Sequence, residues 1–193
     1  LRYVSIDYST KRKLPSGIQP IAAANLPIHG VVGCILSNEL MDAFPVHRFQ
    51  VQNGLIREVF VNLSGAEFID LLQEPSSSII TDRVRKANNK ELPDGYKGEV
   101  SLRIGDWVTE AASALQRGFV LTIDYGGTAA ELYSPKREGG TLRCHYEHVV
   151  SSNPYIRVGR QDITAHVDFT ELKDSGNRCG LEVIGYTTQR EFL

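Results

Sequence analysis

The chain has 193 residues, and its 21 lysines and arginines against 23 aspartates and glutamates leave a formal charge of −2. Hydrophobic residues make up 41 % of the sequence, which is enough for a folded core and excludes a chain that is disordered throughout. Without a basic excess, the electrostatic footprint of a nucleic-acid-binding protein is missing, so we expect no nucleic acid partner. The apolar runs fall short of the ~20 residues that a membrane-spanning helix needs.

Three short apolar segments each end in a polar cluster. Residues 1–6 lead to Asp7, residues 31–36 lead to Asn38, and residues 119–123 lead to Asp124. Short runs rich in β-branched residues are typical of strands buried on both faces, as in parallel sheets. Because ligands bind beyond the carboxyl ends of such strands, we expect an α/β fold with a site at these ends.

Helical segments lie between and after these strands. Residues 105–116 place apolar side chains at helical spacing, and Gly118 is expected to end that helix. Asp168 has the position of an N-cap, with Gly176 closing the short helix that follows. Residues 181–187 are predicted to form another strand.

The segment 47–99 differs in kind from its flanks. Two strands joined by Asn53-Gly54 predict a β-hairpin, because these residues readily take the positive φ angles of a type I′ turn. The polar stretch beyond it is expected to contain a helix at residues 66–74. We interpret 47–99 as an insertion or lid, with a plain surface excursion as an equally good alternative.

The first cluster that could carry chemistry follows residues 31–36. If Asn38 begins a helical turn, Glu39 and Asp42 stand three residues apart and share a face. Two carboxylates so placed could bind a guanidinium or amine, or perform acid–base work. Capping of a helix N-terminus explains the same residues about as well.

Two further clusters are weaker signals. Asp124-Tyr125-Gly126-Gly127 could contact a ligand or simply form a tight loop. Histidines and aspartates in the last third have no specific metal-ligand spacing, so we expect no metal; they are His145, His148, Asp162, His166 and Asp168. The three cysteines lack CxxC spacing, which disfavours a disulfide framework and a zinc site and favours a reducing compartment.

Five blocks of the sequence, taken in order, carry a resemblance to a known family. They are SNELMDAFPVHRF, GFVLTIDYGG, GGTLRCHYEH, GRQDITAHVDF and GYTTQREFL. Together they resemble the MidA-like family of S-adenosylmethionine-dependent methyltransferases, whose mitochondrial members act as an arginine methyltransferase in the assembly of respiratory complex I.

The resemblance implies a class I methyltransferase fold, a doubly wound Rossmann-like α/β sheet with an inserted hairpin and helical element. Residues 1–193 would then form one methyltransferase domain with 47–99 as its insertion or lid. The family's first strand and glycine-rich loop have no counterpart in this sequence, so the domain is expected to be incomplete at the N-terminus.

The resemblance also implies roles for individual residues. The block around residue 38 would lie beside the transferred methyl group, which makes the expected catalytic residues Asn38, Glu39 and Asp42. The expected cofactor-binding residues are Asp7, Ser9, Asn38 and Asp124. The expected substrate-binding residues are Tyr125, Gly126, His148 and His166. The family usually has Glu where Asp7 stands.

The function implied is methyl transfer from S-adenosylmethionine to a protein arginine, with a respiratory-complex subunit as one candidate acceptor. A non-catalytic assembly module that docks through the hairpin stays open as an alternative, as does a small-molecule methyltransferase. Cofactor affinity distinguishes an enzyme from a docking module. The expected location is cytoplasmic for a bacterial source and mitochondrial for a eukaryotic one, and a homodimer stays open.

Overall fold

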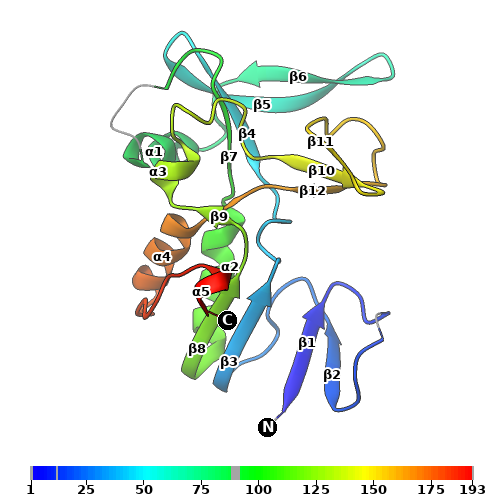
Figure 1. Cartoon of the computed structure of the whole chain (residues 1–193), viewed down its shortest axis with the longest axis vertical. Helices are drawn as coiled ribbons and strands as arrows, with labels where there is room; N and C mark the ends of the chain where they lie inside the picture. Colours follow the sequence, from blue (N-terminus) through cyan, green and yellow to red (C-terminus); the bar gives the residue numbers. More distant parts are fainter. Residues whose placement is uncertain (1, 12, 88–91, 193) are drawn as a thin grey trace.

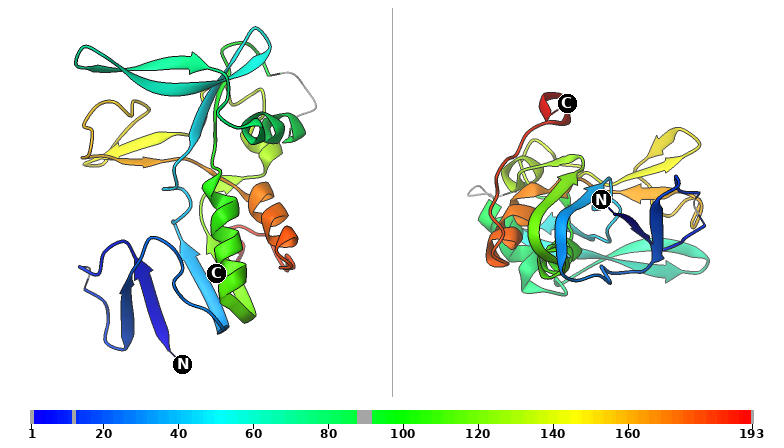
Figure 2. Two further views of the ribbon diagram at one scale, coloured as in Figure 1. Left: turned by 180° about the vertical axis from the view of Figure 1, so that it is seen from behind. Right: turned by 90° about the horizontal axis from the view of Figure 1, so that it is seen from below.

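Parallel strands make up one half of the fold. The computed structural model describes residues 2–11, 13–87 and 92–192. In its lower half (Figure 1), β1 (Tyr3–Asp7) pairs in parallel with β2 (Ile18–Ala22), and β3 (Val31–Asn38) pairs in parallel with β8 (Leu115–Ile123). β1 lies beside β3 in Figures 1 and 2, but the two pairs form separate sheets among the described residues.

Helix α2 (Arg103–Ala114) covers one face of the β3–β8 pair, and α4 (Phe169–Arg178) lies next to it (Figure 2, left). Ile104, Trp107, Val108 and Ala111 recur at helical spacing and are all buried in this core. The helix predicted at 105–116 is therefore confirmed, with its start two residues earlier.

The opposite face of the β3–β8 pair is bare among the described residues. Val32 and Leu36 on β3 are each 61 % exposed, and Phe119 on β8 is 60 % exposed. Alternate residues of β3 point to opposite faces, so the strand buries Ile35 under α2 and leaves Val32 and Leu36 outside.

The other half of the fold is an antiparallel sheet in the order β6-β5-β4-β7. Its strands are β4 (His47–Gln52), β5 (Leu55–Ser64), β6 (Glu67–Gln73) and β7 (Lys97–Val100). The turn between β4 and β5 has φ of 52° at Asn53 and 70° at Gly54, which confirms the predicted hairpin.

A second core joins this sheet to two helices. Phe49, Tyr96 and Val100 pack with Ile80 of α1 (Ser78–Ala87) and with Ala129 of α3 (Ala129–Leu132), among others. The two halves are tied by the buried carboxylate of Glu171 on α4, whose Oε1 lies 2.7 Å from the guanidinium of Arg83 on α1.

Two predicted elements are wrong. The helix predicted at residues 66–74 is replaced by strand β6, because every residue from Glu67 to Gln73 pairs with β5, and this pairing overrides a weak local preference. Residues 181–187 form no strand: they run without regular structure into α5 (Gln189–Phe192), and no strand among the described residues pairs with them.

Short strands connect the two halves. β9 (Gly126–Gly127) pairs in parallel with β13 (Val167–Asp168), and a small sheet has the order β11-β10-β12. Its strands are β10 (Arg143–Tyr146), β11 (Val149–Ser151) and β12 (Asp162–Thr164). None of the described helices has the length and apolar character needed to cross a membrane.

Asp168 caps α4 as predicted: its carboxylate accepts from the N–H groups of Thr170 and Glu171. The two glycines expected to end the helices, Gly176 and Gly118, do not end them. Helix α4 continues past Gly176 to Arg178, and α2 ends at Ala114 and passes directly into β8. Gly118 instead lies inside β8, opposite Gly33 of β3.

We expect Gly118→Ala to lower the free energy of unfolding by about 3 kcal/mol or more, measured by urea denaturation. Gly118 has φ of +138°, and an added Cβ would lie 1.8 Å from the carbonyl oxygen of Gly33. Gly185→Ala is the matched control, because nothing lies within 4 Å of the added Cβ there. Equal stability of the two variants would contradict the close approach of β3 and β8.

Candidate functional site

The end of β3 presents one exposed and one buried carboxylate. Asn38 is the last residue of the strand, and Glu39 follows with φ of +46° in a turn. No helix begins there, so the expected shared helical face of Glu39 and Asp42 is wrong. Glu39 is exposed, whereas Asp42 is only 5 % exposed. The two carboxylates therefore have different access to a ligand.

Asp124, the residue after β8, holds this turn in place. Its Oδ2 accepts from the backbone N–H groups of Leu40 at 3.2 Å, Met41 at 3.0 Å and Asp42 at 3.4 Å. Its Oδ1 accepts from the N–H of Tyr125 at 2.9 Å. Burial and the neighbouring charge of Asp42 raise the pKa of Asp124, although these N–H donors oppose the shift.

Tyr125 bridges the two strand ends. Its hydroxyl donates to Oδ2 of Asp42, while the other oxygen of that carboxylate is buried and has no hydrogen-bond partner among the described residues. Burial and the hydrogen bond to Asp42 raise the pKa of Tyr125 to about 12, so the phenol is neutral at physiological pH. The side chain is still 39 % exposed and borders both Asp42 and solvent.

His166 lies against the ring of Tyr125, with the two ring centres 5.8 Å apart in an edge-on arrangement. Burial, together with the charges of Arg137 and Arg143, lowers the pKa of His166 and favours its neutral form. A guanidinium nitrogen of Arg137 lies 3.5 Å from Nδ1 of the imidazole.

Two supporting residues of this site come from distant parts of the chain. The backbone N–H of His166 donates to the hydroxyl of Thr141 at 3.1 Å, and Thr141 donates through its N–H and its hydroxyl to Oε2 of Glu99. Glu99 lies on β7 in the antiparallel half. Sequence reasoning missed Glu99 and Arg137 and assigned no role to Thr141, because only the folded chain brings them to His166.

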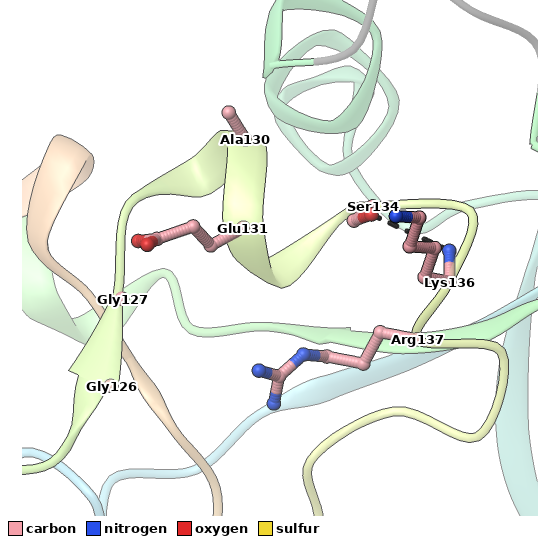
Figure 3. Close-up of a pocket in the computed structure, with 7 residues that line it drawn as sticks. All are labelled: Gly126, Gly127, Ala130, Glu131, Ser134, Lys136 and Arg137. Carbon is pink, nitrogen blue, oxygen red and sulfur yellow. Dashed lines mark hydrogen bonds between the residues drawn. The ribbon is translucent and has the colours of Figure 1, made fainter.

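An open hollow of about 580 Å³ adjoins this cluster (Figure 3). It is lined by Gly126, Gly127, Ala130, Glu131, Ser134, Lys136 and Arg137. In Figure 3 the guanidinium of Arg137 and the side chain of Glu131 on α3 both extend toward β9. Oε2 of Glu131 accepts from the N–H and the hydroxyl of Thr128, which completes the cap of α3.

The remaining predicted residues lie apart from this cluster. Asp7 and Ser9 are exposed at the end of β1, beside a small hollow of about 40 Å³. His148 is exposed in the tight turn between β10 and β11, with φ of +67°. Among the described residues, no three histidine, cysteine or acidic side chains are grouped so as to hold a metal ion.

A family model described as "Putative S-adenosyl-L-methionine-dependent methyltransferase" matches residues 15–187. The chain is 30 % identical over 169 residues to "Protein arginine methyltransferase NDUFAF7, mitochondrial" of Rattus norvegicus, covering 82 % of this chain and 34 % of that protein. It is 28 % identical over 169 residues to the NDUFAF7 homolog of Drosophila melanogaster, covering 81 % of this chain and 36 % of that protein.

The fold also matches a solved structure. A COG1565 superfamily protein from Burkholderia thailandensis, bound to S-adenosyl-homocysteine, superposes with a TM-score of 0.82 at 30 % identity, covering 91 % of this chain and 44 % of that one. This likeness supports the class I methyltransferase fold. The chain spans about a third of the length of the curated relatives and under half of this structure.

We expect Asp124→Ala to lower the free energy of unfolding by about 2 kcal/mol, because four backbone N–H groups lose a charged acceptor. Amide hydrogen exchange at Met41 and Asp42 should become faster in this variant. Asp162→Ala, an exposed position on β12, is the control and should change stability by less than about 0.5 kcal/mol. Unchanged exchange at Met41 would contradict the role given to Asp124.

Proposed function

From the membership of this chain in the MidA-like family of S-adenosylmethionine-dependent methyltransferases, we propose that the protein methylates arginine side chains of other proteins. The match of the family model to residues 15–187 carries this proposal. The relatives named as protein arginine methyltransferases favour arginine as the acceptor. The exposed carboxylate of Glu39 suits a guanidinium, which pairs with carboxylates through two parallel hydrogen bonds.

The chemistry of the exposed residues at the strand ends fits S-adenosylmethionine. The carboxylate of Asp7 is exposed beside a hollow that Ser9 also lines, and a carboxylate at a strand end can accept hydrogen bonds from ribose hydroxyls. We assign Asp7 and Ser9 to the cofactor, with Asn38 at the end of β3. Asp124 would act on the cofactor through the turn that it shapes, since both of its oxygens already accept backbone N–H groups.

The cofactor supplies, when bound, a methyl group on a positively charged sulfur. In our proposal the protein orients the acceptor nitrogen and takes up the proton that this nitrogen releases. Glu39 holds the guanidinium, and its negative charge favours a cation close to the sulfur. Tyr125, Gly126 and His166 line the acceptor side, and His148 would reach the acceptor from the turn of its hairpin.

We further propose that another parallel strand lies between β1 and β3 in the functional protein, with a glycine-rich loop for the cofactor. Two observations support this arrangement: the facing edges of β1 and β3 have no partner strand in the described part of the chain, and the apolar side chains of Val32 and Leu36 are exposed. The single methyltransferase domain, with 47–99 as its insertion or lid, belongs to the same proposal.

Glu39→Gln should reduce methyl transfer at least ~100-fold, because the amide cannot pair as an anion with a guanidinium. Gln keeps the shape of the side chain, so the melting temperature should not change. Glu182→Gln, an exposed glutamate outside the site, is the control. The measurement is incorporation of a labelled methyl group by the full-length protein into a lysate of the source organism, and full activity of Glu39→Gln would contradict the assignment.

Identification of the labelled species in the same assay tests the acceptor. We expect methylated arginine in a protein, with a subunit of a respiratory complex as the first candidate. In a eukaryotic source the labelled protein should be mitochondrial, as the names of the relatives suggest. A labelled small molecule with no labelled protein would contradict the proposed acceptor.

Asp7→Ala should weaken binding of S-adenosylmethionine to the full-length protein at least ~10-fold in calorimetry, because the ribose hydroxyls would lose a charged acceptor. Asp162→Ala should bind the cofactor like the wild type. Wild-type affinity of the Asp7 variant would remove Asp7 from the site, and a wild-type protein without measurable affinity would favour a docking module over an enzyme.

A further inference from the structure

The buried carboxylate of Asp42 bears on how the acceptor loses its proton, and this inference rests on the proposed function. An acceptor nitrogen that gains a methyl group must release a proton. Asp42 is a carboxylate at the end of β3, but it is only 5 % exposed: its Oδ1 is buried, and its Oδ2 already accepts the hydroxyl of Tyr125. Some other group must therefore stand between the acceptor and Asp42.

Tyr125 is placed to be that group. Its side chain is 39 % exposed, and its hydroxyl donates to Oδ2 of the buried carboxylate. We propose that Tyr125 contacts the acceptor nitrogen and relays its proton to Asp42. The proton of the acceptor N–H passes to the phenolic oxygen while the proton of the phenol passes to Oδ2 of Asp42. The phenol is neutral before and after the step, and Asp42 ends as a neutral acid.

Asp42 is a carboxylate that the phenol of Tyr125 reaches directly. Its Oδ2 accepts the hydroxyl of Tyr125, and its Oδ1 has no hydrogen-bond partner among the described residues. The backbone N–H of Asp42 donates to Oδ2 of Asp124 at 3.4 Å, which helps to hold the residue beside Tyr125. In the relay, the proton of the phenol therefore passes to Oδ2 of Asp42.

The ring of Tyr125 is held in the orientation that the relay needs. Its backbone N–H is bound to Asp124, and the edge-on contact with His166 fixes one side of the ring. The raised pKa of the phenol matters as well, because a phenolate would have no proton to pass on to Asp42. Both protons move together in a relay of this kind.

Tyr125→Phe tests the relay, because it removes the hydroxyl and keeps the ring. We expect kcat to fall about 100-fold, with the KM for the acceptor and the affinity for S-adenosylmethionine changed by less than about threefold. The wild type should show a solvent deuterium isotope effect on kcat under single-turnover conditions. Tyr186→Phe, at a tyrosine that is 62 % exposed, is the matched control and should behave like the wild type.

Asp42→Asn supplies a second variant, since an amide can accept the hydrogen bond of Tyr125 but cannot take up its proton. The double variant should lose no more activity than either single variant, because the two residues act as one unit. Carbon NMR of isotope-labelled tyrosine gives a readout without turnover: the signal that is missing in Tyr125→Phe should shift in Asp42→Asn.

The outcomes separate the relay from the proposed function. The relay is overturned if Tyr125→Phe keeps the full kcat. It is also overturned if the variant loses activity only through a higher KM for the acceptor and the wild type shows no isotope effect. Either outcome leaves the proposed arginine methylation unaffected. The relay is likewise overturned if the chemical shift of the Tyr125 signal is the same in Asp42→Asn as in the wild type. A wild-type protein that methylates no arginine overturns the proposed function, and the relay with it.

Discussion

The site depends on one carboxylate, that of Asp124, which ties the turn after β3 to the end of β8. Its Oδ2 accepts the N–H groups of Leu40, Met41 and Asp42, and in doing so it determines the path of the chain beyond Asn38. Because the turn is held in this way, Glu39 is exposed and Asp42 is buried. Tyr125 follows Asp124 directly, so the same attachment places its hydroxyl against Asp42. One residue thus sets how far each of the two carboxylates is exposed to solvent, and with it the access of the proposed acceptor.

The proposed acceptor side of the site requires close backbone contact as well. Gly126 pairs with Val167, and a Cβ at residue 126 would lie 2.0 Å from the carbonyl oxygen of Val167. A side chain there would push the strand that follows His166 away from Tyr125. Glu99, through Thr141, holds His166 from the antiparallel half, so the antiparallel sheet contributes directly to the geometry of the site. A change in that sheet can therefore reach the proposed acceptor side without touching the acceptor.

The difference in burial between Glu39 and Asp42 divides the proposed work between them. An exposed carboxylate can pair with a guanidinium from solvent, whereas a buried one can only receive a proton through a neighbour. The neutral phenol of Tyr125 lies between the two environments and connects them. In this proposal Glu39 binds the acceptor and Asp42 takes up its proton, so neither carboxylate has to perform both tasks.

The sequence by itself determined the features that depend on a few neighbouring residues. The positive φ angles of Asn53 and Gly54, the cap at Asp168 and the apolar spacing of α2 are local properties, and so are the polar clusters that end β3 and β8. Only the tertiary structure decided that residues 67–73 form a strand, that 181–187 do not, and that Asp42 is buried beside Tyr125. These outcomes depend on partners far away in the chain, such as Asp124 for the turn at residues 40–42, and no local pattern encodes the burial that such contacts produce.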